Sequence, residues 1–294
     1  MRGIVFGGAV LHLIAGAILI SFSPVFAKLA GSATTATGFY RMLFGLLGLA
    51  FMFFFGGKLR KPSTKGFLTV CLSGVFFSFD IFFWHKSILY IGPGLSTLLA
   101  NFQVFFLAVI DVVFFRQKMP KKLAAAILMA FFGLYLLVSP GWSGGSSDFK
   151  TGVIYSLITA LMYSGYIMTL RMAGSFERPV DKRLSMVVVT AVSCVLLGLA
   201  AAAGGESLAI PSLRIGIYLL LYGVLCQALG WVIIASALPK TKLTLGGLVL
   251  LLQPSLAYVW DITIFSKPVT AMELTGALIA ISAIYLGTIR NTAK

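Results

Sequence analysis

The chain has 294 residues, of which 59% are hydrophobic and only 11% are charged, and its mean hydropathy is +1.01. Typical soluble domains carry about 25% charged residues, and a soluble fold of this length could not bury so much apolar surface, so a soluble protein is excluded. The net charge of +15 does not indicate nucleic-acid binding, because the basic residues stand in short clusters between long apolar runs. We predict an all-α membrane protein whose partner is the lipid bilayer.

Ten apolar segments approach the length of about 20 residues that a helix needs to cross a bilayer. In chain order they cover residues 6–27, 34–56, 67–90, 94–115, 123–139, 152–170, 184–203, 213–237, 243–265 and 272–289. The first segment resembles a signal peptide, since Arg2 precedes it and Val25-Phe26-Ala27 resembles a cleavage site. Its apolar run is longer than the roughly 7–15 residues usual in signal peptides, so we predict a retained first helix.

The segment from Ser139 to Lys150 is rich in Gly, Ser and Pro and lies at the middle of the chain. This composition is typical of a loop. We predict that it links two halves, residues 1–141 and 142–294, which contain five helices each.

Lys and Arg are distributed unequally between the two sides of the predicted bundle. With both termini in the cytoplasm, 17 of the 23 Lys and Arg residues fall on the cytoplasmic side and five on the other side, while Arg41 lies within a helix. An excess of Lys and Arg marks the cytoplasmic side of a membrane protein. We therefore predict a multi-pass protein of the cell inner membrane with both termini cytoplasmic.

The two halves repeat each other at a nearly constant shift along the chain. Lys28-Leu29-Ala30-Gly31-Ser32 resembles Arg171-Met172-Ala173-Gly174-Ser175, 143 residues later. At a shift of 150 residues the matches are Gly45–Ala50 with Val195–Ala200, Gln103 with Gln253, Asp111 with Asp261, and Tyr135 with Tyr285. The small residues of the fifth helix, Ala126, Ala130 and Gly133, match Gly276, Ala280 and Ala283 of the tenth.

An odd number of helices in each half has a consequence for topology. The second half must enter the membrane from the opposite side, so the two repeats are inverted. Inverted repeats are typical of secondary transporters, whose substrate site lies near the midplane between the repeats. The sequence therefore predicts a transporter that works by alternating access.

Two short segments and the five-plus-five arrangement resemble a known family across the whole chain. Phe39-Tyr40-Arg41-Met42-Leu43 in the second helix and Leu251-Leu252-Gln253-Pro254 in the ninth look like the drug/metabolite transporter superfamily, EamA type. The chain departs from the family pattern at Val104, where proline is usual, and near Gln117 and Lys267, where an acidic residue is usual.

This resemblance implies a cavity lined by helices one to four and six to nine, with helices five and ten packed behind it. It also implies small substrates such as amino acids, nucleosides or amines, commonly exported.

Arg41 and Asp80 are the first candidates for a substrate or coupling site. Charged side chains within a membrane are costly and rarely face lipid, and a rise of 1.5 Å per residue places both residues at similar depth. They form either a substrate or proton site or a structural ion pair. Their counterparts in the second half are Ala191 and Gly230, so the charged site belongs to the first half alone.

Uncharged polar and aromatic residues supply further candidates. Asn101, Gln103 and Gln253 lie mid-helix, where an amide either binds a polar ligand or joins two helices. Aromatic rings at depth either line a cavity or pack against lipid and neighbouring helices, and the candidates are Tyr163, Tyr166, Trp231 and Tyr258.

Two prolines are candidates for hinges. Pro24 and Pro254 each leave a backbone carbonyl without its helical donor, which kinks a helix. Membrane helices also tolerate proline without such a role, so both interpretations stay open.

Asp111 and Asp261 occupy equivalent positions about one turn before the ends of their predicted helices. They are either solvated interfacial carboxylates or latches of a gate. Trp84, His12 and His85 also lie towards predicted helix ends, and we expect them at the membrane interface, with a proton relay as the alternative role for the histidines.

The leading functional hypothesis is a secondary transporter of a small metabolite, with amino acids or related amphipathic compounds and export suggested by the family resemblance. A proton gradient, exchange or facilitated diffusion could drive it. An exchanger of organic anions or phosphorylated metabolites is the alternative, suggested by Arg41, Lys86 and Lys240-Thr241-Lys242.

A channel or an intramembrane enzyme is a hypothesis of another class. The chain contains no H-E-x-x-H, no G-x-S-x-G and no P-loop motif. Cys71, Cys194 and Cys226 lie in apolar runs without metal-binding spacing. We predict no enzymatic activity, no metal and no cofactor.

Overall fold

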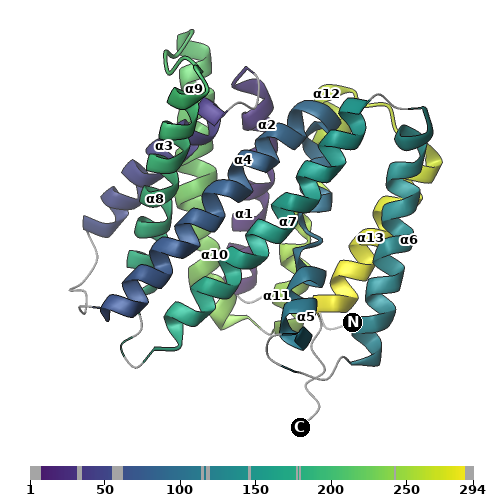
Figure 1. Ribbon diagram of the computed structural model, residues 1–294, viewed down its shortest axis with the longest axis horizontal. Helices are drawn as coiled ribbons and strands as arrows, with labels where there is room; N and C mark the ends of the chain where they lie inside the picture. Colours follow the sequence, from purple (N-terminus) through teal and green to yellow (C-terminus); the bar gives the residue numbers. More distant parts are fainter. Residues whose placement is uncertain are drawn as a thin grey trace.

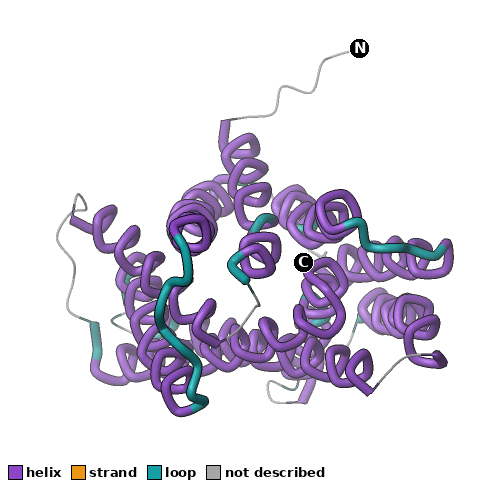
Figure 2. Tube along the Cα trace, turned by 90° about the horizontal axis from the view of Figure 1, so that it is seen from above, coloured by secondary structure: helices purple, strands orange, loops and turns teal. Residues whose placement is uncertain are grey.

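The computed structural model describes residues 8–31, 35–54, 62–113, 116, 120–144, 147–176, 178, 180–241 and 243–288, and every regular element in these ranges is a helix (Figures 1 and 2). In chain order the elements are α1 (Gly8–Ser21), α2 (Ser23–Leu29), α3 (Thr35–Phe54), α4 (Thr64–Ala100), α5 (Gln103–Val113), α6 (Lys121–Gly144), α7 (Ser147–Gly174), α8 (Lys182–Ala203), α9 (Leu213–Leu221), the π-helix η1 (Tyr222–Gly230), α10 (Trp231–Ala237), the 3₁₀ turn η2 (Leu238–Lys240), α11 (Leu243–Leu250), α12 (Leu252–Phe265) and α13 (Ala271–Thr288).

Within the described residues, seven helical segments are long and apolar enough to cross a membrane, and two further apolar helices are shorter, Thr35–Phe51 and Ala271–Gly287. The predicted all-α membrane fold is therefore confirmed. The predicted segment 213–237 differs in detail, because the π-helix η1 interrupts it between α9 and α10.

The longest apolar segment, Thr64–Ile110, turns back on itself at Gly92. Gly92 has a φ of +80°, outside the helical range, and the Trp84 indole N–H donates to Thr97 Oγ1 at 3.3 Å. Thirteen residues of straight helix would separate these positions by about 20 Å. Helix α4 therefore consists of two antiparallel legs that meet at Gly92, as the gap between the third and fourth predicted segments indicates.

Three membrane segments are broken near their middle. Phe22 separates α1 from α2 just before Pro24, and Leu251 separates α11 from α12 shortly before Pro254. The missing proline N–H explains both breaks. The third break, at Asn101 and Phe102, lies between α4 and α5 and is related to Leu251 by the 150-residue shift. Both predicted kinks are confirmed, whereas a hinge role stays a prediction.

The loop predicted from Ser139 to Lys150 is wrong. Helix α6 continues through Pro140 to Gly144, and α7 begins at Ser147. A Cβ atom on Gly141 would lie 2.5 Å from the Phe149 ring, so the glycine allows the ends of the two helices to pack closely. The division of the chain near residue 141 stays a prediction.

Helices α6 and α13 pack directly against each other at one edge of the bundle (Figure 1). Their predicted small residues form the contact, since Ala126, Ala130, Ala280 and Ala283 are at most 1% exposed. A Cβ atom on Gly276 would lie 2.6 Å from the backbone nitrogen of Leu137. The fifth and tenth predicted helices therefore pack together, as the family resemblance implies.

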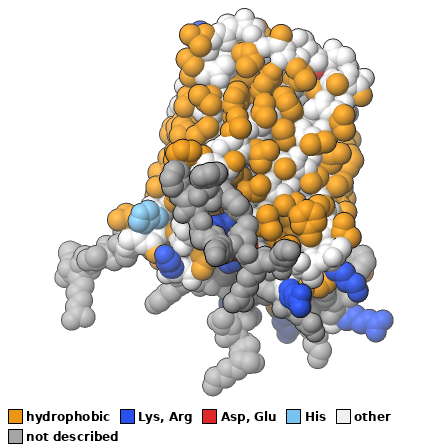
Figure 3. Space-filling model, turned by 90° about the vertical axis from the view of Figure 1, so that its left-hand side faces the viewer, with side chains coloured by type: hydrophobic (Ala, Val, Ile, Leu, Met, Phe, Trp, Pro, Cys, Tyr) orange, Lys and Arg blue, Asp and Glu red, His pale blue; other side chains and the backbone are white. Residues whose placement is uncertain are grey.

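The surface agrees with a membrane-embedded bundle. On the face shown in Figure 3, apolar side chains cover most of the height, and Lys and Arg gather at the lower end. Helix α1 begins and α13 ends at this same lower end (Figure 1). Arg2, Lys58, Arg60, Lys61, Lys118, Lys242, Arg290 and Lys294, which the orientation argument uses, lie outside the described residues.

Candidate functional site

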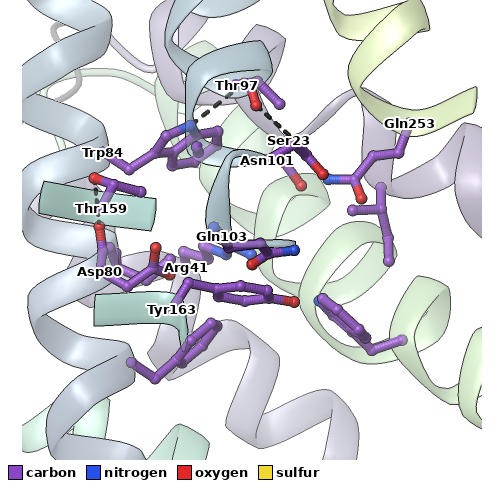
Figure 4. Close-up of a pocket in the computed structure, with 15 residues that line it drawn as sticks. Ser23, Arg41, Asp80, Trp84, Thr97, Asn101, Gln103, Thr159, Tyr163 and Gln253 are labelled. Atoms are coloured by element: carbon purple, nitrogen blue, oxygen red, sulfur yellow. Dashed lines mark hydrogen bonds between the residues drawn. The ribbon is translucent and has the colours of Figure 1, made fainter. Parts of the chain in front are cut away.

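A cavity of about 90 Å³ lies inside the bundle, between the two halves (Figure 4). The first half contributes four of the predicted residues to its lining, Arg41, Asp80, Asn101 and Gln103. The second half contributes three, Tyr163, Trp231 and Gln253. The structure thus brings seven of the nine predicted contact residues together around one space.

Asp80 borders this cavity from the first leg of α4. Its side chain is 6% exposed, and its carboxylate has no hydrogen-bond or ion-pair partner among the described residues; its backbone carbonyl accepts from Thr159 Oγ1 at 3.5 Å. A buried carboxylate without a partner is costly in a membrane interior. A cationic group or water within the cavity would offset this cost.

Arg41 lines the same cavity from α3, but it does not form the ion pair with Asp80 that was one interpretation of the sequence. The charged atoms of the two described side chains are more than 4.0 Å apart. Arg41 instead donates to Gln227 Oε1 at 3.0 Å and to Tyr222 Oη at 3.1 Å. These neutral acceptors replace the carboxylate because the π-helix η1 packs against α3 at this point. The guanidinium also lies over the rings of Tyr222 and Trp84, 4.9 and 5.6 Å from their centroids, and none of the described carboxylates lies within 4.0 Å of it.

Three polar atoms of the lining lack hydrogen-bond partners within the described part of the chain. They are Ser23 Oγ, which can donate or accept, Gln103 Oε1, an acceptor, and Trp231 Nε1, a donor. Most buried polar atoms in proteins are hydrogen-bonded, to protein or to ligand and water. The cavity therefore presents a cation, an anion, a donor and an acceptor to whatever occupies it.

Trp84 and His85 are buried inside the bundle. Trp84 is 7% exposed and lines the cavity, and His85 is 1% exposed. The Trp84 indole N–H donates to Thr97 and His85 Nε2 lies 3.3 Å from Tyr222 Oη, so both side chains face neighbouring helices rather than lipid; their depth in the membrane stays a prediction. His12 is exposed at the start of α1, as predicted.

Tyr166 and Tyr258 do not line the cavity. Tyr166 packs behind it, with its ring centroid 4.9 Å from that of Phe77 and 5.3 Å from that of Tyr163. Tyr258 packs against the turn of α4, where a Cβ atom on Gly94 would lie 2.8 Å from its Cα.

Asp261 is buried, with 1% of its side chain exposed, so the prediction of a solvated carboxylate is wrong. It accepts a hydrogen bond from the Gly94 N–H at 3.0 Å and lies 3.9 Å from Lys28 Nζ. The tight turn at Gly92 carries the backbone of α4 against α12, which removes Asp261 from solvent. Asp111 lies in α5, and its side chain is outside the described part of the structure.

Glu206, which the sequence argument did not single out, makes a second contact at the same end of the bundle. It accepts from the backbone N–H groups of Thr35 and Ala36, at 3.3 and 2.8 Å, and lies 3.9 Å from Lys86 Nζ. Burial alone would raise the pKa of this carboxyl, but these N–H groups and the Lys86 ammonium outweigh burial and hold its pKa below the usual value.

The sequence argument also missed Tyr222 and Gln227, because neither has a charge or a counterpart in the other half. The signals available were a tyrosine and a glutamine within one apolar segment, and the glycines Gly223 and Gly230 beside them.

Comparisons with known proteins agree with this architecture. Residues 7–139 and 150–289 each match the EamA-like transporter family. A solved structure, described only as the crystal structure of a protein, aligns with a TM-score of 0.65 and 15% sequence identity, covering 96% of this chain and 99% of that chain. This likeness shows the fold alone. No match is found among curated proteins. Because the family match covers both halves, the chain belongs to the EamA-like transporter family, with one family repeat in each half.

Proposed function

We propose that the protein is a secondary transporter that exports an amino acid or a related amphipathic metabolite by alternating access. The observation that carries the proposal is that the Asp80 carboxylate and the Arg41 guanidinium line one cavity without forming an ion pair with each other or with another described residue. A substrate with an ammonium and a carboxylate group would satisfy both charges at once. Trp84, Tyr163 and Trp231 would contact its apolar part.

The proposed topology has ten crossings in two inverted repeats, divided near residue 141. The seven long apolar segments, with Thr64–Ile110 crossing twice, and the two shorter apolar helices support this number. Odd numbers of crossings in each repeat place α1 and α7 in opposite orientations. We place the protein in the cell inner membrane with both termini in the cytoplasm.

In this mechanism, the two ends of the bundle open in turn around a fixed site. Asp261, with Lys28 and Gly94, is the proposed latch on the extracytoplasmic side. Asp111, its repeat-related counterpart, is the proposed latch on the cytoplasmic side. Protons are the proposed coupling ion, with Asp80 as their site, since a carboxylate without a partner can alternate between substrate and proton.

Counterflow in proteoliposomes tests this function. Vesicles loaded with unlabelled amino acids should accumulate a labelled amino acid from outside, and vesicles loaded with inorganic phosphate should not. A flux that rises linearly with substrate concentration and does not depend on the solute inside the vesicles would indicate a channel. The absence of flux for every amino acid would reject the proposed substrate class.

The anion exchanger stays the second candidate, and Arg41 is the observation that favours it. Lys86 no longer supports it, because Lys86 lies beside Glu206 and outside the cavity lining. Asp80 also opposes an anion that lacks a cationic group. Counterflow with phosphate-loaded vesicles would establish this candidate instead.

A further inference from the structure

A buried series of hydrogen bonds leads from Arg41 through Tyr222 and His85, neither of which lines the cavity. Tyr222 Oη accepts from Arg41 and lies 3.3 Å from His85 Nε2, and His85 Nδ1 lies 2.7 Å from the carbonyl oxygen of Ile81. The carbonyl can only accept, so Nδ1 carries the proton. A second cation beside Arg41 is disfavoured, so the ring is neutral and Nε2 accepts from the Tyr222 hydroxyl. Each group in this hydrogen-bond series therefore donates to the next, from Arg41 through Tyr222 and His85 to the carbonyl oxygen of Ile81.

Gln227 fixes a second edge of the guanidinium. Its Oε1 accepts from Arg41 Nε at 3.0 Å, and its Nε2 donates to Thr190 Oγ1 at 3.4 Å. The first bond sets the orientation of the amide, because Arg41 can only donate and the amide oxygen must therefore face it; the nitrogen then faces the Thr190 hydroxyl, which accepts. Gln227 is 5% exposed and Tyr222 is fully buried, and neither residue lines the cavity.

The π-helix η1 explains why Tyr222 and Gln227 reach the same guanidinium. In an α-helix, residues five apart point about 140° away from each other. In a π-helix the hydrogen bonds run from residue i to residue i+5, which brings such residues onto nearly the same face. The wider helix of Tyr222–Gly230 therefore turns both side chains towards α3.

Glycines allow η1 to approach α3 closely enough for these bonds. A Cβ atom on Gly45 would lie 2.5 Å from Gln227 Cγ, and a Cβ atom on Gly223 would lie 2.5 Å from Phe44 Cβ. Both contacts are shorter than real Cβ atoms make, so larger residues would push the two helices apart. The position of Arg41 thus depends on backbone contact between the two halves.

These contacts leave only one edge of Arg41 available. A guanidinium has five N–H donors, and Gln227 and Tyr222 occupy the one on Nε and one on NH1. The three that remain are one on NH1 and two on NH2, and one N–H from each of these nitrogens forms the end edge of the guanidinium. We propose that Tyr222, Gln227 and His85 are positioning residues that present this edge to the cavity, so that it binds a substrate carboxylate end-on through two parallel hydrogen bonds. This inference rests on the proposed function.

Nuclear magnetic resonance tests the positioning chain without any substrate. The protein contains two histidines, so the variant His12→Gln leaves His85 as the only source of ¹⁵N-histidine signals. We expect a protonated Nδ1 and an unprotonated, hydrogen-bonded Nε2, and Tyr222→Phe should shift the Nε2 resonance while Nδ1 stays protonated. Protonation of His85 at Nε2, or an Nε2 resonance that does not move in the Tyr222→Phe variant, would overturn the proposed hydrogen bond from Tyr222 to His85.

Binding to purified protein tests its effect on Arg41, with three probes of similar shape. L-leucine carries both charged groups, 3-methylbutylamine lacks the carboxylate, and 4-methylpentanoate lacks the ammonium. Tyr222→Phe and Gln227→Leu should each weaken binding of L-leucine and 4-methylpentanoate about tenfold, the scale expected for a hydrogen bond to a charged group, and leave 3-methylbutylamine unchanged. Calorimetry gives the three dissociation constants.

The matched control is Tyr218→Phe, which removes an exposed tyrosine hydroxyl that accepts from Arg214 at 3.0 Å; all three affinities should stay as in the wild type. Equal weakening for all three probes in Tyr222→Phe would indicate general damage to the fold and would overturn the positioning role. If the wild type binds none of the probes, the proposed substrate class is rejected, and the ¹⁵N spectra alone decide the positioning chain.

Discussion

The carboxylate of Asp261 accepts a hydrogen bond from the backbone N–H of Gly94 at 3.0 Å, so a side chain of α12 caps the second leg of α4. The contact crosses from one family repeat to the other. A carboxylate at a helix N-terminus is stabilised by the free N–H groups and by the helix dipole. The Lys28 ammonium at 3.9 Å adds a second link from the first half.

Asp261→Ala should open this end of the bundle. The variant loses a charge-assisted hydrogen bond and an ion pair, each about 1–3 kcal/mol when buried. In a background without native cysteines, a cysteine placed at Thr97 in the cavity should react roughly tenfold faster with an impermeant maleimide added outside. Asp148→Ala, in the exposed first turn of α7, is the control, and equal rates in both variants would contradict the latch.

Gly92→Ala should destabilise the folded protein. The backbone of Gly92, with φ +80° and ψ 166°, lies in a region that is essentially restricted to glycine and costs other residues about 1–3 kcal/mol, and the added Cβ would lie 2.8 Å from Asp261 Oδ2. The melting temperature in detergent should fall by several degrees. Gly174→Ala, where nothing lies within 4 Å of the added Cβ, should melt like the wild type; a similar loss in both would remove the special role of the turn.

Asp80→Asn and Arg41→Ala should each abolish counterflow while the protein stays folded in the membrane. Each removes the charge that a zwitterionic substrate needs, and the remaining charge then lacks its partner in the loaded cavity. Transport in proteoliposomes, together with elution as a single species on gel filtration, checks this prediction. Wild-type rates in both variants would show that the cavity is not the substrate site.

Stability should depend on pH through Glu206. Its pKa in the folded state is held below the usual value of 4.5, so the ionised form stabilises the fold above that pH and this contribution is lost as pH falls below it. Glu206→Gln should lower the melting temperature at pH 7, and the difference from wild type should shrink as the pH falls below 4.5 and through the lowered pKa of the folded state. A difference that stays constant with pH would assign the effect to packing rather than charge.

The sequence predicts most of the architecture, because hydropathy and repeat matches depend on many residues at once. The turn at Gly92, the kinks before Pro24 and Pro254 and the small residues between α6 and α13 follow from residue types with strong backbone preferences. The loop predicted at Ser139–Lys150 is wrong because its Gly, Ser and Pro residues lie within the ends of α6 and α7, where Gly141 allows close contact with Phe149.

The site is only partly predictable. Arg41 and Asp80 stand out because charge is rare in these helices, but their partners do not, since hydrogen bonds from Arg41 depend on the π-helical register of η1. The hydrophobic periodicity of the sequence does not reveal that η1 contains extra residues per turn, which is what brings Tyr222 and Gln227 to Arg41. The burial of Asp261 was not predicted, because it depends on where α4 turns back.

The two repeats have taken different roles around Arg41. The first repeat supplies the guanidinium, and the second supplies Tyr222 and Gln227, whose counterparts at the 150-residue shift are Leu72 and Phe77. A homodimer of the first half would therefore carry two arginines and nothing to hold either one. A second copy of the first half in place of the second would lack the hydroxyl and the amide that hold Arg41.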